Sequence, residues 1–308
     1  MDISVIIPTH NRAKLLERTL QGFCQQNSSE IDWELIIVSD GSIESTDEVV
    51  MGFKDRLPLR YFSQPKSGVS SARNLGLDKA RGHIVLFVDD DVVPTPELIN
   101  EHVRFHRIRS ETESVLLGYV TWLPELEITP FMQWYGEFGG LFGFSLLKDD
   151  RQNDPRYLYS CNLSLKAEFL RTNGRFNPSL SVLEDHELGF RLKQHGMKMY
   201  FRRAALGYHN QKFTFNQACQ RLKRYSDGLG AFCTTDAGRA MLKLRSRRAF
   251  RLAELAVRVL APALSPLRML VDSKVRLPNA VYRLLYWYYG SYRAFWACNS
   301  PQVRAGKS

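Results

Sequence analysis

Apolar runs alternate with helical segments through the first ninety residues, and this alternation constrains the fold more than any other feature of the chain. Four runs have the β-branched, apolar composition of buried strands, at residues 3–8, 33–40, 59–64 and 83–88. Three segments between them have helical spacing or a capping serine, at residues 12–26, 45–55 and 68–80. The alternation predicts an α/β fold with a parallel sheet covered by helices.

Aspartates follow two of the predicted strands. Asp40 ends the second one in IIVSDGS, and Asp89, Asp90 and Asp91 directly follow the fourth one in LFVDDDVVP. Strands disfavour aspartate, and ligands of such sheets bind beyond the carboxyl ends of the strands. We therefore expect these carboxylates to line a ligand site. A solvated acidic turn is the alternative for the three consecutive aspartates.

The glycine-rich loops that hold phosphates in other nucleotide-binding folds are absent from the sequence. No G-x-G-x-x-G follows the first predicted strand, where PTHNR (8–12) stands instead, and no G-x-x-x-x-G-K-[ST] occurs. A bound metal is the obvious substitute for such a loop. Mg²⁺ and Mn²⁺ prefer oxygen ligands, and a cation at the aspartates would offset their repulsion and neutralise a departing diphosphate.

Four further residues could carry chemistry, and each has a structural alternative. Glu184 and Asp185 begin a predicted helix, where they would either complement the helix dipole, worth ~0.3–1 kcal/mol, or supply a general base. His209 ends a strand pattern and is either structural or a metal ligand. Arg73 suits phosphate or base recognition, although a solvated position is the default for a single arginine.

Taken together, these segments resemble the family 2 inverting glycosyltransferases of the nucleotide-diphospho-sugar transferase superfamily. The family has a GT-A fold, in which a Rossmann-like, mostly parallel sheet is flanked by helices. The resemblance covers roughly residues 1–210 and rests on an ordered series of stretches: SVIIPTHNR, IIVSDGS, GVSSARNLGLDKARGHIVLFVDDD and NLSLKAEFLRTNGRFNPSLSVLEDHELGFRLKQHG. Ser39 precedes Asp40 where the family often has a second aspartate, and SIES replaces its usual serine-threonine-aspartate.

The resemblance implies a role for each matching residue. Asp91 and His209 would bind the metal, Asp185 would act as the catalytic base, and Asn162 and Glu184 would lie on the acceptor side. The nucleotide-sugar would contact a larger set, namely Pro8, Thr9, Asn11, Arg12, Asp40, Arg73, Asp89 and Asp90.

The implied reaction is a single in-line displacement from a nucleotide-diphosphate sugar, with a UDP-sugar as the expected donor. Asp185 would accept the proton of an acceptor hydroxyl, and a Mn²⁺ or Mg²⁺ ion would hold the leaving diphosphate. The reference pKa of an aspartate, ~3.9, predicts that Asp185 is ionised at neutral pH.

The C-terminal part of the chain is strongly basic. From Lys243 onward, 13 Lys and Arg face two acids, a net charge of +11, which leaves −1 for residues 1–242. We expect a glycosyltransferase domain at 1–242, with a nucleotide-sugar half at 1–92 and an acceptor half at 93–242. Residues 243–308 are expected to form a basic amphipathic helical tail, since no apolar run there is long enough to span a bilayer.

The tail has the composition of a membrane-surface segment. A stripe with Arg247, Arg251 and Arg258 would face anionic lipid, and Trp287 and Trp296 would lie at the interface. The alternatives are packing on the catalytic domain or on a second subunit, and, least favoured, nucleic-acid binding without a recognised module. Membrane attachment would suit a lipid-linked acceptor or a growing surface glycan.

The remaining features predict a cytoplasmic protein that is peripheral on the inner face of the cell membrane. Five cysteines are scattered without metal-ligand spacing, and the N-terminus lacks the pattern of a signal peptide. Two other functions stay open on the sequence alone. One is a phosphatase of the haloacid dehalogenase type that uses Asp89 and Asp91, and the other is a non-catalytic membrane-associated protein with the same fold.

Overall fold

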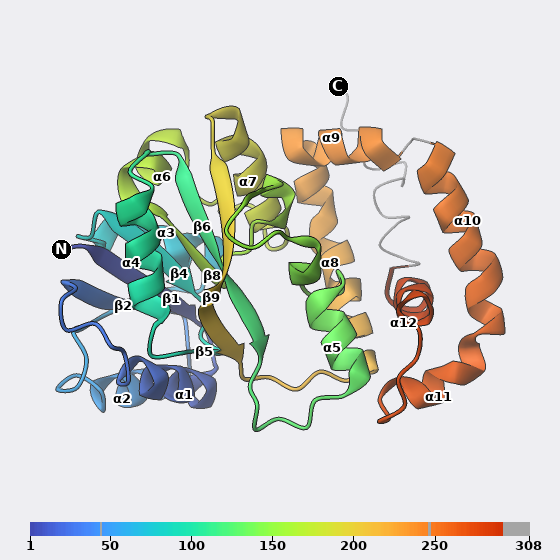
Figure 1. Cartoon of the computed structure of the whole chain (residues 1–308), viewed down its shortest axis with the longest axis horizontal. Helices are drawn as coiled ribbons and strands as arrows, with labels where there is room; N and C mark the ends of the chain where they lie inside the picture. The colour runs from blue at the N-terminus through green and yellow to red at the C-terminus, as the bar shows by residue number, and fades with distance from the viewer. Residues whose placement is uncertain (44, 246–247, 292–308) are drawn as a thin grey trace. The chain divides into compact units, whose positions relative to one another are not determined.

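The computed structural model describes residues 1–43, 45–245 and 248–291 (Figure 1). The chain divides into two compact units. The first contains Met1–Leu126 and Leu147–Gln211, and the second contains Glu127–Leu146 and the residues from Lys212 onward. The division into a catalytic part (1–242) and a basic tail (243–308) stays a prediction.

The first unit is built on one mixed sheet. Its strands in the described residues are β1 (Ile3–Thr9), β2 (Trp33–Asp40), β3 (Leu59–Gln64), β4 (Ile84–Val88), β5 (Val92–Pro94), β6 (Ser114–Trp122), β7 (Gln152–Asn153), β8 (Asn162–Lys166) and β9 (Lys198–His209). They lie in the order β3-β2-β1-β4-β8-β6-β9-β5, with β7 paired to β9. This sheet confirms the predicted α/β class and its GT-A topology.

The first four strands are parallel, as the sequence pattern predicted, and the rest of the sheet is mixed. β1 pairs in parallel with β2 and β4, whereas β8 runs antiparallel between β4 and β6. The carboxyl ends of β1, β2 and β4 therefore meet at one edge of the sheet. The stretch SVLLGYVTWL (114–123), whose sequence pattern allows a strand pair, instead contains the single strand β6, which has an irregularity between Gly118 and Tyr119.

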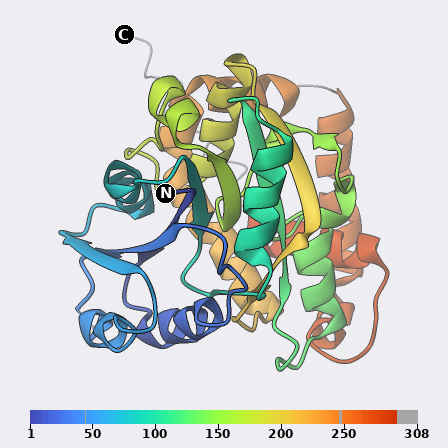
Figure 2. The same cartoon turned by 60° about the vertical axis from the view of Figure 1, so that its left-hand side comes forward.

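The helices of the first unit pack along this sheet (Figure 2). They are α1 (Ala13–Phe23), α2 (Thr46–Met51), α3 (Val69–Lys79), α4 (Leu98–Ile108), α6 (Ala167–Asn173) and α7 (Glu184–Gln194). α3 packs against β1 and β2, and α4 packs against β6 and β9. A side chain at Gly76 of α3 would clash with β1, because its Cβ would lie 2.3 Å from Cγ2 of Ile6. The glycine thus lets α3, which carries Arg73, lie close to the sheet.

The second unit is helical. Its described helices are α5 (Pro130–Glu137), α8 (Phe215–Thr234), α9 (Asp236–Arg245), α10 (Arg248–Ala263), α11 (Arg268–Val271) and α12 (Asn279–Tyr286), followed by a π-helical turn (Trp287–Ser291). Segment 128–147, whose aromatic and glycine-rich sequence allows either a loop or a core segment, contains α5, whose aromatic rings are buried in this unit. Phe131, for example, lies 5.4 Å from Phe215 and 6.0 Å from Tyr282 between ring centroids.

The basic tail is helical over its described part, as predicted. Proline usually ends a helix, but Pro262 lies inside the last turn of α10, which ends at Ala263. Within residues 1–43, 45–245 and 248–291, no helix is long and apolar enough to cross a bilayer.

Candidate active site

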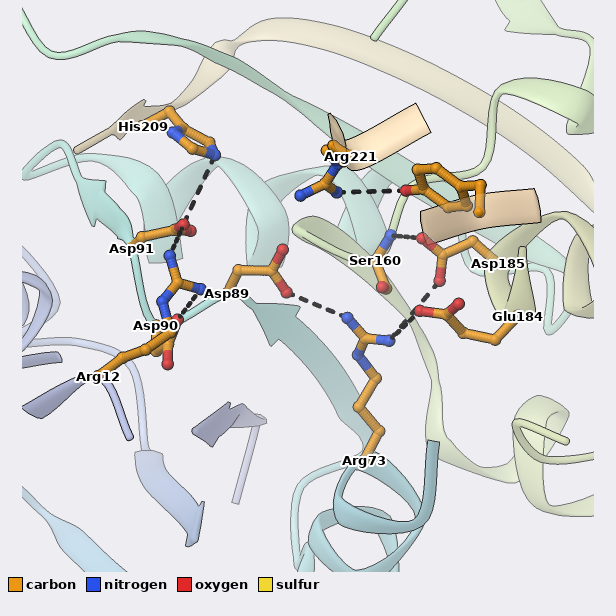
Figure 3. A network of polar contacts seen from close by, with 11 residues as sticks. Arg12, Arg73, Asp89, Asp90, Asp91, Ser160, Glu184, Asp185, His209 and Arg221 are labelled. Atoms are coloured by element: carbon orange, nitrogen blue, oxygen red, sulfur yellow. Dashed lines mark hydrogen bonds and ion pairs between the residues drawn. The ribbon is translucent and has the colours of Figure 1, made fainter. Parts of the chain in front are cut away.

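The acidic turn Asp89–Asp91 connects β4 to the short strand β5. The backbone N–H of Val92 donates to the carbonyl of Asp89 at 3.1 Å, which closes a tight turn. The hydroxyl of Thr19, on α1, donates to the carbonyl of Asp90 at 2.9 Å. Contacts to its backbone therefore fix the turn, and its carboxylates face two arginines: Asp90 and Asp91 share Arg12, whereas Asp89 faces Arg73 (Figure 3).

Asp90 is the most enclosed member of the turn at 3% exposure. It accepts hydrogen bonds from the hydroxyl of Thr9 at 2.8 Å and from Nη1 of Arg12 at 2.7 Å. Burial raises the pKa of Asp90 to about 7, against the opposing effect of the Arg12 charge. Three residues expected at the nucleotide therefore contact one another here.

Asp91 faces His209 across the edge of the sheet. The antiparallel pairing of β5 with β9 sets Val92 opposite His209, and Oδ2 of Asp91 lies 3.6 Å from Nε2 of the histidine. The same Oδ2 also accepts a hydrogen bond from Nη2 of Arg12. Two residues expected to bind a metal are thus adjacent, with an arginine on the shared carboxylate.

The chemistry of this pair fits a Mn²⁺ or Mg²⁺ ion that takes most of its ligands from substrate. A carboxylate oxygen and an imidazole nitrogen are both suitable donors, and Mg²⁺ in particular is usually held by one or two carboxylates together with phosphates and water. Among the residues that the structure describes, no group of three or more His, Cys, Asp or Glu side chains is arranged to hold a metal.

Arg73 connects the acidic turn to the start of α7. Its guanidinium is buried and donates to Asp89 at 3.1 Å and to Glu184 at 2.9 Å. The same group lies 3.8 Å from Oδ1 of Asp185 (Figure 3). The next residue, Asn74, exchanges two hydrogen bonds with the backbone of Phe176, at 2.8 and 3.1 Å. Arg73 was expected at the nucleotide, and its contacts in this structure are with three carboxylates.

Asp185 lies in the first turn of α7, two residues after an N-cap residue with an uncommon backbone conformation. Leu183, at the N-cap, has φ +58°, a left-handed value that side chains rarely adopt and that clusters at functional sites. The backbone N–H of Ser160 donates to Oδ2 of Asp185 at 3.1 Å. This contact could not be predicted from the sequence, since a backbone donor carries no residue preference.

The surroundings of Asp185 change its expected ionisation. Although 21% of its side chain is accessible, burial raises the pKa of Asp185 to about 7. The negative charge of Glu184 adds to this rise, and the positive charge of Arg73 opposes it. Asp185 is therefore a stronger base than the reference value predicted, and its pKa lies near the optimum for proton transfer at neutral pH.

Asp40 holds the loop that follows β3. Its carboxylate accepts hydrogen bonds from the backbone N–H groups of Ser67 and Gly68 at 2.8 and 2.9 Å, and from the amide of Gln64 at 2.7 Å. These contacts position the N-terminus of α3, the helix of Arg73. The expected contact of Asp40 with a nucleotide base stays a prediction.

Two further residues expected at the nucleotide, Pro8 and Asn11, have structural positions in β1 and shortly after it. Asn11 adopts φ +51°, and its side chain accepts from the N–H of Ile43 at 2.9 Å, which joins the end of β1 to the end of β2. Pro8 lies within β1, opposite Val38.

Asn162, expected on the acceptor side, is fully buried. Its Oδ1 accepts from Nε2 of His102 at 2.8 Å, and its Nδ2 donates to the carbonyl of Ala205 at 2.9 Å. Burial lowers the pKa of His102 to about 4, which keeps that ring neutral. These contacts give Asn162 a role in fixing the core, and its role toward an acceptor stays a prediction.

The tail residues singled out by the sequence are only partly described. Arg247 and Trp296 lie outside the described residues, as does the side chain of Arg251. Arg258 on α10 and Trp287 are both half-buried. The expected basic stripe therefore cannot be traced along this helix.

Comparison with known proteins identifies the family. Residues 4–116 match the family described as "Glycosyl transferase family 2", and residues 84–299 match "Glycosyl transferase family group 2". The chain belongs to glycosyl transferase family 2. This membership sets aside the phosphatase interpretation of Asp89 and Asp91.

Curated relatives include a validoxylamine A glucosyltransferase from Streptomyces hygroscopicus, 31% identical over 231 residues, which are 67% of this chain and 54% of that protein. A "GalNAc(5)-diNAcBac-PP-undecaprenol beta-1,3-glucosyltransferase" from Campylobacter jejuni is 40% identical over 92 residues, 29% of each protein. The chain spans about half the length of the validoxylamine A glucosyltransferase.

Solved structures share the fold at low identity. The mannosyltransferase PcManGT from Pyrobaculum calidifontis, in complex with GDP-Man and Mn²⁺, has a TM-score of 0.64 and 16% identity over 96% of this chain and 87% of its own. TarS residues 1–349 from S. aureus, in complex with UDP-GlcNAc, has a TM-score of 0.58 and 17% identity over 99% of this chain and 92% of its own. Both support the GT-A assignment.

Proposed function

We propose that this protein transfers a sugar from a nucleotide-diphosphate sugar to an acceptor hydroxyl with inversion at the anomeric carbon, and that Asp185 is the base. One observation carries the proposal. The buried guanidinium of Arg73 contacts Asp89 on the strand-end turn and lies 3.8 Å from Asp185. The candidate base is therefore one side chain away from the turn expected to hold the donor.

The proposed roles follow from the contacts. Asp185, with its pKa near 7, accepts the proton of the acceptor hydroxyl as that oxygen attacks the anomeric carbon. The Ser160 N–H and Arg73 orient its carboxylate. Asp91 and His209 would hold a Mn²⁺ or Mg²⁺ ion, which neutralises the charge of the departing diphosphate when bound. Asp89 would face the ribose.

The proposed donor is a UDP-sugar, and the proposed acceptor is a lipid-linked or growing surface glycan. The TarS complex contains UDP-GlcNAc, whereas the mannosyltransferase complex contains GDP-Man. The name of the Campylobacter relative includes an undecaprenol-linked glycan, which supports a lipid-linked acceptor here. The UDP-sugar proposal rests on the sequence resemblance and on the TarS complex. The alternative donor is a GDP-sugar.

The purified protein tests the donor directly. We expect thermal stabilisation by one class of nucleotide-sugar in the presence of Mn²⁺, since a ligand at 100 times its dissociation constant adds ~2.7 kcal/mol to stability. The same nucleotide-sugar should be slowly hydrolysed, and Asp185→Asn should bind it without turnover. A protein that binds no nucleotide-sugar, with or without metal, would support the non-catalytic alternative.

We also propose that the second unit attaches the protein peripherally to an anionic membrane surface on the cytoplasmic side. Leu252, Leu255 and Val259 lie at spacings of three and four residues on α10 and are 65%, 56% and 63% exposed. These spacings put the three side chains on one face of the helix. The net charge of +11 from residue 243 onward complements anionic lipid. The apolar face, rather than an arginine stripe, is therefore the proposed contact.

Flotation of the full-length protein with vesicles tests this attachment. We expect binding to vesicles that contain phosphatidylglycerol, and its loss in Leu255→Asp/Val259→Asp. Ile108→Asp is the matched control, because Ile108 is an equally exposed apolar residue (64%) at the end of α4 in the first unit. Equal flotation of all three proteins would refute the proposed contact. A change of oligomeric state in the double variant without loss of flotation would instead indicate contact between copies of the chain.

A further inference from the structure

Arg12 is the counter-ion of the acidic turn in this structure. Its Nη1 donates to Asp90 and its Nη2 donates to Asp91, so that one planar group bridges both carboxylates (Figure 3). The two aspartates are 3% and 4% exposed. Buried carboxylates need a positive partner, because the loss of hydration costs several kcal/mol per ion. Arg12 supplies that partner from the first turn of chain after β1.

The arginine contacts the same Asp91 oxygen that faces His209. Oδ2 of Asp91 accepts from Arg12 and lies 3.6 Å from Nε2 of His209. A divalent cation between Asp91 and His209 would therefore compete with the guanidinium for the same carboxylate. A cation that arrives alone must displace Arg12 into water and lose the charge-assisted hydrogen bond, which makes its binding weaker.

The rest of the turn is held independently of Arg12. Thr9 donates to the side chain of Asp90 and Thr19 donates to its carbonyl. Arg12 itself is 33% exposed, and its Nη2 also donates to the side-chain oxygen of Gln211 at 3.3 Å. The guanidinium can therefore leave Asp91 while the backbone of the turn stays in place.

We propose that Arg12 is a displaceable counter-ion that makes binding of the cation depend on the nucleotide diphosphate. The inference rests on the proposed function and adds a regulatory step to it. When cation and diphosphate arrive together, the guanidinium exchanges the Asp91 carboxylate for phosphate oxygens, which match its fork geometry. The diphosphate thereby replaces the contact that the cation removes, and each ligand strengthens the binding of the other by the same factor.

Titration of the full-length protein with Mn²⁺, followed by electron paramagnetic resonance of the free ion, tests the proposal without measuring turnover. Without nucleotide, Arg12→Gln should bind Mn²⁺ at least about tenfold more tightly than the wild type, a factor that corresponds to ~1.4 kcal/mol. With saturating UDP, the wild type should gain much more Mn²⁺ affinity than the variant gains. Arg12→Lys, which keeps the charge but cannot bridge two carboxylates with one planar group, should lie between them.

Arg18→Gln is the matched control. Arg18 lies on α1, six residues further along, and its ion pair with Glu125 at 3.2 Å is exposed on both sides. This variant removes the same charge and should bind Mn²⁺ as the wild type does. If Arg12→Gln and Arg18→Gln bind free Mn²⁺ equally, or if UDP strengthens Mn²⁺ binding equally in both, the proposal is wrong while the metal site stands. If no variant and no wild type binds Mn²⁺ even with UDP, the proposal and the metal part of the proposed function both fail.

Discussion

Nη2 of Arg73 lies 3.1 Å from Oδ1 of Asp89, and this ion pair links α3 to the turn that ends β4. The other terminal nitrogen of the same arginine contacts Glu184 at 2.9 Å and lies 3.8 Å from Asp185. Arg73 thus lies between the turn expected to bind the donor and the candidate base. These contacts make it a positioning residue for Asp185 in the proposed reaction.

Replacement of Arg73 should therefore affect the base as well as the rate. Arg73→Gln removes the positive charge that opposes the rise in the pKa of Asp185, so that this pKa increases further. We expect kcat/KM to fall by at least about tenfold at pH 7. We also expect the acidic limb of the pH profile of kcat/KM to move to higher pH. Arg175→Gln is the control. Arg175 pairs with Asp78, which lies on α3 as Arg73 does, and the side chains of Arg175 and Asp78 are each 45% exposed. An unchanged pH profile would leave Arg73 with a purely structural role.

The wild-type enzyme should show a matching pH dependence. A base acts in its deprotonated form, and the pKa of Asp185 is about 7 in the protein without ligands. We expect kcat/KM, which reports the free enzyme, to be nearly constant above about pH 8, half-maximal near pH 7 and to fall tenfold per unit well below it. An aspartate with the reference pKa of ~3.9 would instead keep full activity down to about pH 5. A pH–rate profile at fixed saturating Mn²⁺ separates the two, provided that Mn²⁺ binding is measured over the same range.

Asp185→Asn should abolish transfer and leave binding of the nucleotide-sugar almost unchanged. The amide can still accept the hydrogen bond from Ser160 but cannot take a proton, and loss of a general base typically costs about 10²–10⁴-fold. Glu184→Gln provides the comparison on the same helical turn, and it should cost less because Glu184 contacts Arg73 without a proposed proton transfer. Turnover by Asp185→Asn within a few-fold of the wild type would show that another group is the base.

The strand ends could be predicted from the sequence, because the buried parallel strands are continuous apolar runs and the acids follow them directly. This local pattern predicted the acidic turn and carried the family resemblance. The partners of Arg73 could not be predicted, since Glu184 lies 111 residues away and is brought near only by the docking of α7. For the same reason, the sequence could not predict that Asn162 is buried against His102, which is 60 residues away in the chain. The family resemblance placed Asn162 on the acceptor side, a role that stays a prediction, and tertiary packing gives it core partners as well.

The three aspartates of the turn should respond differently to substitution. Asp91→Ala removes the carboxylate that faces His209, so we expect it to lose the Mn²⁺-dependent part of activity while the protein remains folded. Asp90 has two side-chain partners and 3% exposure, so Asp90→Ala leaves Thr9 and part of Arg12 unsatisfied. That loss should lower the free energy of unfolding by about 1–3 kcal/mol.

Thermal unfolding without ligands, together with turnover across a Mn²⁺ titration, distinguishes the two effects. Asp91→Ala removes one contact of Arg12 but keeps the Thr9 hydrogen bond to Asp90, so it should unfold closer to the wild-type temperature than Asp90→Ala does, and it should fail to respond to Mn²⁺. Asp90→Ala should unfold at a lower temperature and, below that temperature, keep more activity than Asp91→Ala. The opposite order, with Asp90→Ala the less active of two equally stable variants, would assign the metal to Asp90 and contradict the proposed site.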